Sequence, residues 1–369
     1  MKTKVFAAYL PQFHQIAEND LFWGEGFTDW DNVKTAKPLF DGHIQPKKPL
    51  DENYYDLSHI ETIKWQASIA KQYGVDGFNI YHYWFKDGKH VLYKPAELLL
   101  ANPGIDIKYF FSWDNCSWVR SWGQHVGNAW SPKSDEGRKG TFLLLEFSYG
   151  NKEQWRNHFL YLLPFFNDPR YLKIDGRPVF AFMTSLNSDK LIEMCDYWQE
   201  LSREHRLEGL YLISNCDALR NKKLLDNQFF YQPNAAAWGM RMSIENKLKK
   251  YFKIQSKQKG NVKYNYDYDF VWKRLLRTAD RNRKSRLILG GIVKFDDTPR
   301  RGNQARIITN ASPEKFEFYF RKLYQLCCNT NREILLLTAW NEWGEGAYLE
   351  PDIENGYEYL EALKNAIEN

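Results

Sequence analysis

Short runs of apolar, β-prone residues recur along the chain and are separated by longer segments with helical periodicity. Eight of these runs have the length and apolar character of buried strands: 4–10, 75–84, 107–113, 177–183, 209–215, 229–235, 286–295 and 333–340. Strands that alternate with helices are typical of parallel βαβ units. The pattern therefore predicts an α/β protein with a parallel sheet.

Amphipathic segments follow several of these runs. Apolar residues keep to one helical face in 57–74, 188–205, 312–329 and 356–368. Ser312 is suited to cap the third of these helices, and Pro313 to occupy its first turn. These spacings predict helices that pack their apolar faces against the sheet.

Eight strand–helix units favour a closed (β/α)8 TIM barrel, and an open sheet with a miscounted strand is the alternative. One such barrel with long βα loops accounts for 369 residues, so we expect a single domain over 1–369. The long connections are 11–56, 114–150, 236–285 and 296–311. Loops at the carboxyl ends of barrel strands build active sites, so we expect the cleft there.

One connection is strongly basic. Lys247–Lys263 contains seven lysines and no acidic residue, inside an insertion that we place at about 246–286. Such a run is typical of a solvated segment. The alternative is peripheral contact with anionic lipid headgroups or a charged glycan.

Composition narrows the function classes. Aromatic residues make up 17% of the chain, with 14 Trp and 23 Tyr, which suits both a large core and stacking on sugar rings. A net charge of +5 does not demand a nucleic acid partner. The five cysteines lack zinc-site spacing, and no nucleotide-binding glycine motif is present. We therefore expect no metal and no cofactor.

The sequence also gives an expectation for the location of the protein in the cell. The start of the chain lacks an apolar signal segment, and no apolar run is long enough to cross a bilayer. An odd number of cysteines fits reduced thiols. We expect a cytoplasmic protein, whereas the oligomeric state is not indicated.

The clearest chemical signal is the segment Trp340–Gly346, directly after an apolar run. Its acidic residues, Glu342 and Glu345, are three positions apart and are flanked by tryptophan and glycine. Glycoside cleavage requires two carboxyl groups, one to protonate the leaving oxygen and one to act as nucleophile or base. The pair predicts catalytic residues. Two solvated glutamates on a surface loop are the alternative.

Other polar and aromatic residues leave the expected strand ends and are candidates for sugar binding through hydrogen bonds and stacking. They are Tyr9, Gln12, His14, Trp23, Trp30, Tyr81, His82, Trp84, Trp113, Asp114, Asn115, Trp118, Arg120, Asp296, Asp297, Arg300, Trp340, Asn341 and Trp343. Each has a structural alternative. The aromatic residues could be core, His82 a buried histidine, and the Asp and Arg residues of 295–301 a salt bridge within their own loop.

The blocks YLPQFH, FWGEGFTDW, GFNIYHYWF, FDDTPRRGNQA and AWNEWGEGAYLEPD occur in this order. With them the chain resembles the WbsX-like proteins of polysaccharide-synthesis loci, relatives of the family 99 endo-α-mannosidases and mannanases. The resemblance implies a (β/α)8 barrel and retaining chemistry on α-linked sugars. It implies Glu345 as general acid/base, and Glu342 as the base that deprotonates the sugar 2-OH to give a 1,2-anhydro intermediate. A glycosyl-enzyme through Glu342 is the alternative, and it requires carboxyl groups ~5–5.5 Å apart.

Two positions depart from the pattern of these relatives. Cys116 stands where they carry a carboxylate, and Asp29 stands where a glutamate is usual. Three hypotheses follow. The first is a glycoside hydrolase acting on an α-linked, mannose-containing polysaccharide or lipid-linked oligosaccharide. The second is a glycosyltransferase of surface polysaccharide (lipopolysaccharide O-antigen or capsule) biosynthesis, and the third a carbohydrate-binding protein without catalysis.

Overall fold

The computed structural model describes residues 2–120, 142–183, 188–216, 225–238 and 264–368. The segment Lys247–Lys263, for which we considered membrane contact, lies outside these residues.

Eight parallel strands form the centre of the molecule. Their order around the sheet is β10-β9-β8-β4-β2-β1-β15-β12. They are β1 (Lys4–Tyr9), β2 (Gly77–Trp84), β4 (Lys108–Trp113), β8 (Arg177–Phe182), β9 (Tyr211–Asn215), β10 (Asn227–Phe229), β12 (Leu289–Ile292) and β15 (Ile334–Thr338). A parallel bridge between Phe229 and Ile288 joins the two ends of this sheet. The predicted barrel is therefore confirmed, and the open sheet is excluded.

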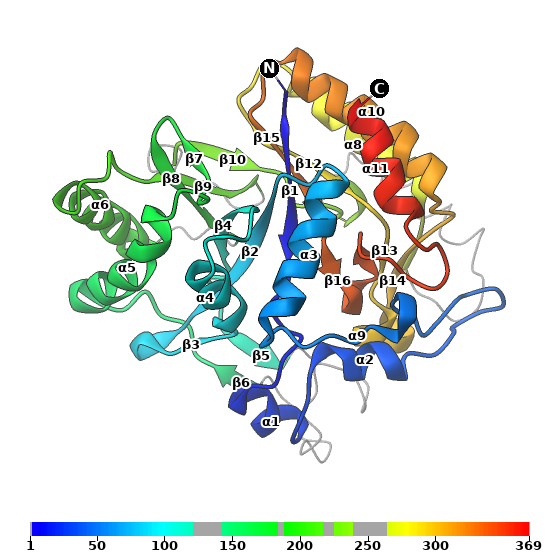
Figure 1. The fold of residues 1–369 in the computed structure, drawn as a ribbon, viewed down its shortest axis with the longest axis horizontal. Coiled ribbons are helices and arrows are strands. Elements are labelled where there is room, and N and C mark those ends of the chain that lie inside the picture. The colour runs from blue at the N-terminus through cyan, green and yellow to red at the C-terminus, as the bar shows by residue number, and fades with distance from the viewer. Residues whose placement is uncertain (1, 121–141, 184–187, 217–224, 239–263, 369) are drawn as a thin grey trace.

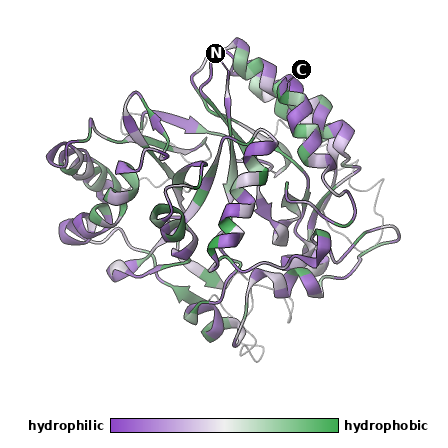
Figure 2. Cartoon of the chain, viewed as in Figure 1, coloured by the Kyte–Doolittle hydropathy of each residue, from purple (hydrophilic) through white to green (hydrophobic). Residues whose placement is uncertain are grey.

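Helices surround the strands (Figure 1). They are α3 (Ile60–Gln72), α4 (Lys94–Ala101), α5 (Lys152–Asn167), α6 (Asp189–Glu204), α8 (Tyr268–Arg281), α10 (Pro313–Asn329) and α11 (Glu358–Glu368). Apolar and polar residues alternate along these helices in Figure 2, as expected when one face of each is buried. The Ser312 hydroxyl accepts a hydrogen bond from the Lys315 amide at 3.3 Å, so the predicted cap of α10 is confirmed.

Two sequence expectations need correction. The sixth strand is β10, Asn227–Phe229, and the following Asn234–Trp238 forms a π-helical turn instead of continuing the strand over 229–235. The expected insertion at about 246–286 contains α8, the barrel helix between the sixth and seventh strands. The Asp267 side chain caps α8 by accepting a hydrogen bond from the Phe270 amide at 3.0 Å. The lysine-rich composition nearby obscured this helix.

Additional short elements complete the described residues. They are α1 (Ala17–Trp23), α2 (Asp29–Thr35), α9 (Thr298–Arg301), β3 (His90–Val91), β5 (Trp118–Arg120), β6 (Phe142–Leu145), β7 (Lys173–Ile174), β11 (Tyr264–Asp267), β13 (Phe295–Asp296), β14 (Arg306–Thr309), β16 (Asn341–Glu342) and β17 (Ala347–Tyr348), with 3-10 turns at 50–52, 86–88, 302–304 and 343–345. In Figure 1 the N-terminus lies at the top, and α1, α2, α9 and the β5–β6 hairpin lie together at the lower end. This is the end at which the barrel strands finish.

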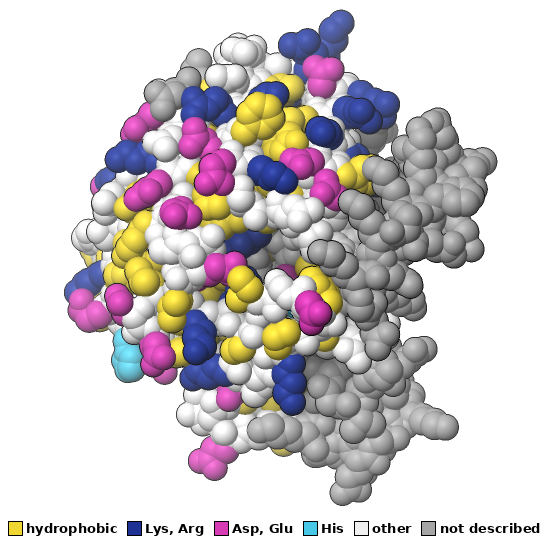
Figure 3. Space-filling model, turned by 90° about the vertical axis from the view of Figure 1, so that its right-hand side faces the viewer, with side chains coloured by type: hydrophobic (Ala, Val, Ile, Leu, Met, Phe, Trp, Pro, Cys, Tyr) yellow, Lys and Arg dark blue, Asp and Glu magenta, His cyan; other side chains and the backbone are white. Residues whose placement is uncertain are grey.

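The surface shows no single-sign block on the face drawn in Figure 3, where acidic and basic side chains are interspersed. Among the residues that the structure describes, no helix combines the length and apolar character required to cross a bilayer.

Candidate active site

A cavity of about 360 Å³ opens at the carboxyl ends of the barrel strands. Its wall includes residues at or just after the ends of seven of the eight strands, and Arg300 from the connection that follows β12. They are Leu10, Gln12, Trp23, Tyr81, Tyr83, Asp114, Ser117, Trp118, Val119, Leu144, Met183, Asn215, Tyr231, Asn234, Arg300, Glu342 and Glu345. Concave sites of this size, with aromatic walls and a few polar groups, are typical of small-ligand binding.

Arg300, from α9, joins three carboxylates at this cavity. Its Nη2 lies 2.8 Å from Asp29 Oδ2 and 3.2 Å from Glu342 Oε2, and its Nη1 lies 3.2 Å from Glu345 Oε1. We call these four residues the Arg300 cluster. The contact with Glu342 is an ion pair without good hydrogen-bond alignment, since that carboxylate oxygen has no hydrogen-bond partner by geometry. One guanidinium thus holds both predicted catalytic carboxylates at one place.

The two glutamates differ in exposure. The Glu342 side chain is 4% exposed, whereas that of Glu345 is 23% exposed and faces the cavity more openly. Burial raises the pKa of Glu342 to about 8; Arg300 opposes this rise, and Glu345 and Asp29 add to it. A carboxyl with this environment can hold a proton near neutral pH. The site therefore offers one accessible and one deeply buried carboxyl.

The backbone around the pair is fixed by specific local contacts. The buried Asn341 accepts a hydrogen bond from the Leu10 amide at 2.7 Å and donates one to the Leu10 carbonyl at 3.0 Å. This joins the loop after β15 to the end of β1. A Cβ atom at Gly344 would overlap the Arg300 guanidinium and the Asp29 carboxylate. Glycine at 344 is therefore required for the close approach of α9 and α2 to this turn.

A second buried carboxyl, Glu350, contacts the turn that carries Glu342 and Glu345. It accepts hydrogen bonds from Trp343 Nε1 at 2.6 Å, Gln66 Nε2 at 2.7 Å and the Tyr55 hydroxyl at 2.8 Å. Burial raises its pKa to about 7, although these hydrogen bonds act in the opposite direction. The sequence reasoning missed Glu350, because nothing in the run AYLEPD distinguishes a buried acid from a surface one.

Several cavity residues were also missed. The Tyr231 hydroxyl lies 2.6 Å from that of Tyr81, and Tyr83 lies on the same strand as Tyr81 two positions on. Alternate residues of a strand face the same side. Because Tyr81 faces the cavity, this alternation was the signal that could have found Tyr83. Nothing comparable marks Met183, Asn215 or Tyr231, each of which is an isolated residue at a strand end.

The same alternation turns His82 and Trp84 away from the cavity. His82 Nε2 lies 2.7 Å from Nε2 of His158 on α5, and Trp84 stacks on His158 at 4.2 Å between ring centroids. Burial lowers the pKa of His82 to about 3, so it is neutral in the fold. Both residues therefore differ from the expectation of sugar binding and pack between the barrel and α5.

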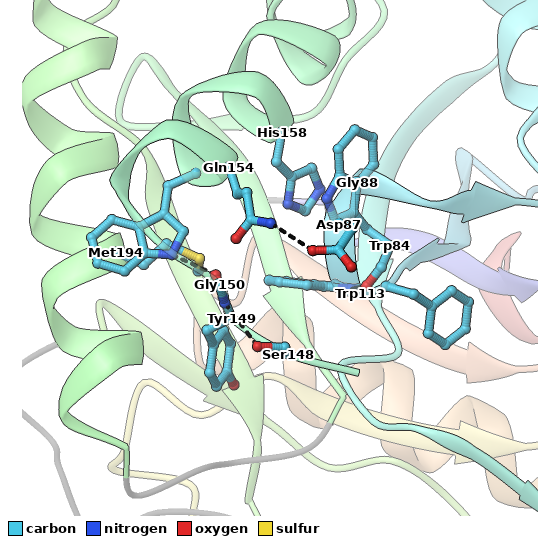
Figure 4. Close-up of a pocket in the computed structure, with 12 residues that line it drawn as sticks. Trp84, Asp87, Gly88, Trp113, Ser148, Tyr149, Gly150, Gln154, His158 and Met194 are labelled. Atoms are coloured by element: carbon cyan, nitrogen blue, oxygen red, sulfur yellow. Dashed lines mark hydrogen bonds between the residues drawn. The ribbon is translucent and has the colours of Figure 1, made fainter. Parts of the chain in front are cut away.

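Trp113 also faces the helix layer, against Trp198 of α6. Trp84, Trp113 and His158 border a separate small pocket (Figure 4), in which Gln154 donates a hydrogen bond to Asp87 at 3.0 Å. Its volume is about 10 Å³, which suffices for one water molecule and not for a sugar. This pocket is therefore a packing feature.

Six further candidates are buried in contacts within the protein and do not line the cavity: Tyr9, His14, Trp30, Asn115, Trp340 and Trp343. The Tyr9 hydroxyl donates to Gln66, Trp30 Nε1 to the Tyr55 carbonyl, and Asn115 to Tyr149. Trp343 stacks on Tyr348 at 3.7 Å. The large aromatic side chains go to the core because their apolar area is worth most there. Asn341, which was predicted to bind sugar, is also buried and bonds the Leu10 backbone instead of lining the cavity.

Asp296 of the 295–301 block binds residues of the loop after β1, whereas Asp297 binds arginines close to it in the sequence. Asp296 accepts hydrogen bonds from Gln45 at 2.7 Å and contacts His43 at 2.7 Å, and these contacts lower its pKa despite burial. Asp297 pairs with Arg301 at 2.9 Å and Arg306 at 2.8 Å. The alternative of a structural salt bridge therefore holds for Asp297, whereas Arg300 crosses to the glutamates.

The predicted residues that do line the cavity are Gln12, Trp23, Tyr81, Asp114, Trp118, Arg300, Glu342 and Glu345. The side chain of Arg120 lies outside the described part of the structure. Within the described ranges, no three His, Cys, Asp or Glu side chains come together as a metal site would require.

Comparison with known proteins identifies the family of the chain. Residues 5–363 match the family described as "Glycosyltransferase WbsX". The chain belongs to the WbsX family. It is 28% identical over 98% of its length to the uncharacterized protein WxcX of Xanthomonas campestris pv. campestris strain B100, and to the same protein of strain ATCC 33913. It spans about half the length of these curated relatives, 49% in both.

Solved structures show how the WbsX fold relates to glycoside hydrolases. A GH99 endo-alpha-mannosidase from Bacteroides thetaiotaomicron superposes with a TM-score of 0.55 and 13% identity, covering 98% of this chain and 96% of that one. A glycoside hydrolase-like protein superposes with a TM-score of 0.58 and 14% identity, covering 99% and 94%. At these identities the likeness shows the fold, which is that of a GH99-like barrel.

Proposed function

We propose that this WbsX protein is a metal-independent glycoside hydrolase that cleaves an α-linked glycan with retention. The observation that carries the proposal is the meeting of Glu342 and Glu345 at Arg300, on the wall of an aromatic cavity. Two carboxyls of unequal environment are what acid and base roles require. By analogy with the endo-alpha-mannosidase of the same fold, we propose a mannose-containing polysaccharide or lipid-linked oligosaccharide as substrate.

The roles follow from exposure and basicity. Glu345, the more exposed carboxyl, protonates the leaving oxygen as the glycosidic bond breaks. Glu342 acts in its ionised form, which with a pKa of about 8 is the minor form at neutral pH and a stronger base than a free glutamate. It takes the proton of the sugar 2-OH, and O2 bonds to the anomeric carbon. Water then opens the 1,2-anhydro ring, giving its proton to Glu345 while Glu342 returns its proton to O2. Arg300 stabilises the ionised carboxylates throughout.

The test is the substitution Glu345→Gln, compared with Glu61→Gln on the exposed face of α3. We expect a loss of ~10²–10⁴-fold in kcat on an unactivated α-glycan. The loss in the bond-breaking step should be smaller on a glycosyl fluoride, because fluoride leaves without protonation. Turnover of the unactivated glycan that is undiminished contradicts the proposal.

The family description keeps glycosyl transfer as a second candidate. A sugar-nucleotide donor requires groups that bind its diphosphate. Arg300, the cation of the cavity wall among the described residues, already contacts Asp29, Glu342 and Glu345. Calorimetry with a set of nucleotide sugars separates the two functions. Binding that is lost with the diphosphate removed supports transfer, and absence of nucleotide-sugar binding together with glycan cleavage supports hydrolysis.

A further inference from the structure

One part of the cavity wall is not used by the Arg300 cluster. Asp114 follows β4, with β2 and β1 between this strand and β15. Tyr83 of β2 and Trp118 of β5 line the cavity beside it, and the Tyr83 and Trp118 rings meet edge to face at 5.3 Å between centroids. We call Asp114, Tyr83 and Trp118 the Asp114 edge.

The carboxylate of this edge has a weak partner among the described residues. The Asp114 carboxylate accepts a hydrogen bond from the Cys116 thiol at 3.1 Å, which is a weak donor. No cation among the described residues pairs with it. Tyr83 is 6% exposed and lines the cavity beside Asp114. A carboxylate on a cavity wall whose described partner is one thiol can accept further hydrogen bonds, which indicates a ligand that donates them.

The charge of the wall limits what that ligand can be. Asp114, Glu342 and Glu345 are acidic, and Arg300 is the described basic residue that lines the cavity with them. Because Arg300 is already shared by three carboxylates, Asp114 faces the cavity without an ion pair to any residue that the structure describes. Burial accordingly raises the pKa of Asp114. An acidic ligand group at this edge would meet like charge in a poorly solvated site, which is costly.

We propose that the Asp114 edge is the specificity subsite of the cavity. Asp114 accepts a hydrogen bond from a sugar hydroxyl, Tyr83 bonds the same ring, and Trp118 packs against its apolar face. The ligand class is a non-acidic sugar, and uronates, sulfated sugars and sugar phosphates are rejected at this position. The inference rests on the proposed function only in taking the ligand to be a saccharide.

The experiment begins with calorimetry of a panel of neutral methyl α-glycosides against the wild-type chain. For the tightest binder, each ring hydroxyl is replaced in turn by hydrogen and by sulfate. We expect one hydroxyl whose removal weakens binding about 10-fold or more in the wild type, because its bond to a charged acceptor is lost. In Asp114→Asn the same removal should have a much smaller effect. Sulfate at that position should bind to Asp114→Asn and not to the wild type.

Matched variants test the integrity of the fold. Asp280→Asn changes an exposed aspartate on α8 and should leave every affinity unchanged, and Tyr83→Phe should weaken the same hydroxyl contact. Thermal unfolding checks that Asp114→Asn folds. Equal losses on hydroxyl removal in the wild type and Asp114→Asn overturn the proposal, as does wild-type binding of sulfated and neutral sugars alike or of no neutral glycoside.

Glu345→Gln is measured in parallel with the same ligands. Because Glu345 is not part of the Asp114 edge, this variant should retain the wild-type dependence on the hydroxyl. A Glu345→Gln variant that retains turnover contradicts the hydrolase mechanism while leaving the subsite result standing. Loss of turnover in Glu345→Gln without any effect of Asp114→Asn contradicts the subsite alone.

Discussion

Nη2 of Arg300 lies 3.2 Å from Oε2 of Glu342, in a place where both side chains are almost fully removed from water. The same nitrogen also lies 2.8 Å from Asp29, and Nη1 contacts Glu345. A guanidinium is planar and presents five N–H donors, so it can contact several carboxylates at once. Arg300 therefore makes a buried group of three acids compatible with a stable fold.

The first prediction concerns this arginine. In Arg300→Lys, a single ammonium cannot span the three carboxylates, and we expect kcat/KM to fall by about 100-fold or more. In Arg300→Met the carboxylates remain buried without a cation, and the free energy of unfolding should fall by about 3–5 kcal/mol. Glycan cleavage assays and urea titration measure the two effects. Arg283→Lys, at an exposed position of the chain, is the control and should resemble the wild type.

The second prediction is that Gly344→Ala causes a large loss of activity and a smaller loss of stability, so that the variant still folds. The added methyl group would overlap Arg300 and Asp29, so the cluster must shift. We expect kcat/KM to fall by about 100-fold, because displacement of catalytic groups by about 1 Å has this effect. The unfolding free energy should fall by about 1–3 kcal/mol. Gly104→Ala, where an added Cβ meets nothing within 4 Å, should retain full activity, and equal behaviour of both variants would refute the argument.

The barrel could be predicted from the sequence because its strands are buried on both faces. β2 and β15 are buried at every residue, so they form mainly apolar and aromatic runs, with Asn79 and His82 as the polar positions inside β2. β10 was misplaced because its three residues are too short to give a pattern, and because the aromatic residues that follow Phe229 extend the apparent strand toward Asn234–Trp238, which forms a turn. Strand boundaries of this kind depend on contacts with neighbouring strands, which the local sequence does not contain.

The site could be predicted in part. Glu342 and Glu345 were found because two acids close together after an apolar strand are unusual. The sequence did not show which of two adjacent strand residues points into the cavity. His82 and Tyr83 are an example, because they lie on opposite sides of β2. The choice between loop salt bridge and site residue also depends on tertiary contacts. Arg300 and Arg301 are adjacent, yet one contacts the glutamates and the other Asp297.

The third prediction concerns Asn341, which joins β1 to the turn that carries Glu342 and Glu345. In Asn341→Ala, the amide and carbonyl of Leu10 both lose a buried hydrogen-bond partner. Each unsatisfied group costs about 1–3 kcal/mol, so we expect the unfolding free energy to fall by about 2–6 kcal/mol. Denaturant titration measures the change. Asn102→Ala removes one hydrogen bond at the end of α4 and should cost less, and a smaller loss in Asn341→Ala than in this control would contradict the anchoring role.

The last prediction links the burial of Glu342 to the pH dependence of stability. Its pKa in the fold is about 8, against 4.5 for a free glutamate. Between these values the folded chain keeps the proton and the unfolded chain releases it. The protonated Glu342 therefore stabilises the fold fully below pH 4.5, and this contribution is lost as pH rises to 8. Glu342→Gln carries no such proton, so its stability relative to the wild type should increase with pH by up to about 1.4 kcal/mol per unit.

Urea titrations of wild type and Glu342→Gln at pH 5.5, 6.5 and 7.5 measure this difference directly. Subtracting the two curves removes the contributions of other groups, including Glu350, whose raised pKa of about 7 acts in both proteins. Glu61→Gln, at an exposed position of α3, provides the baseline and should give a constant difference from the wild type. If the advantage of Glu342→Gln over the wild type stays constant or shrinks as pH rises, Glu342 is ionised in the folded chain throughout this range, and the proton that we assign to it is absent.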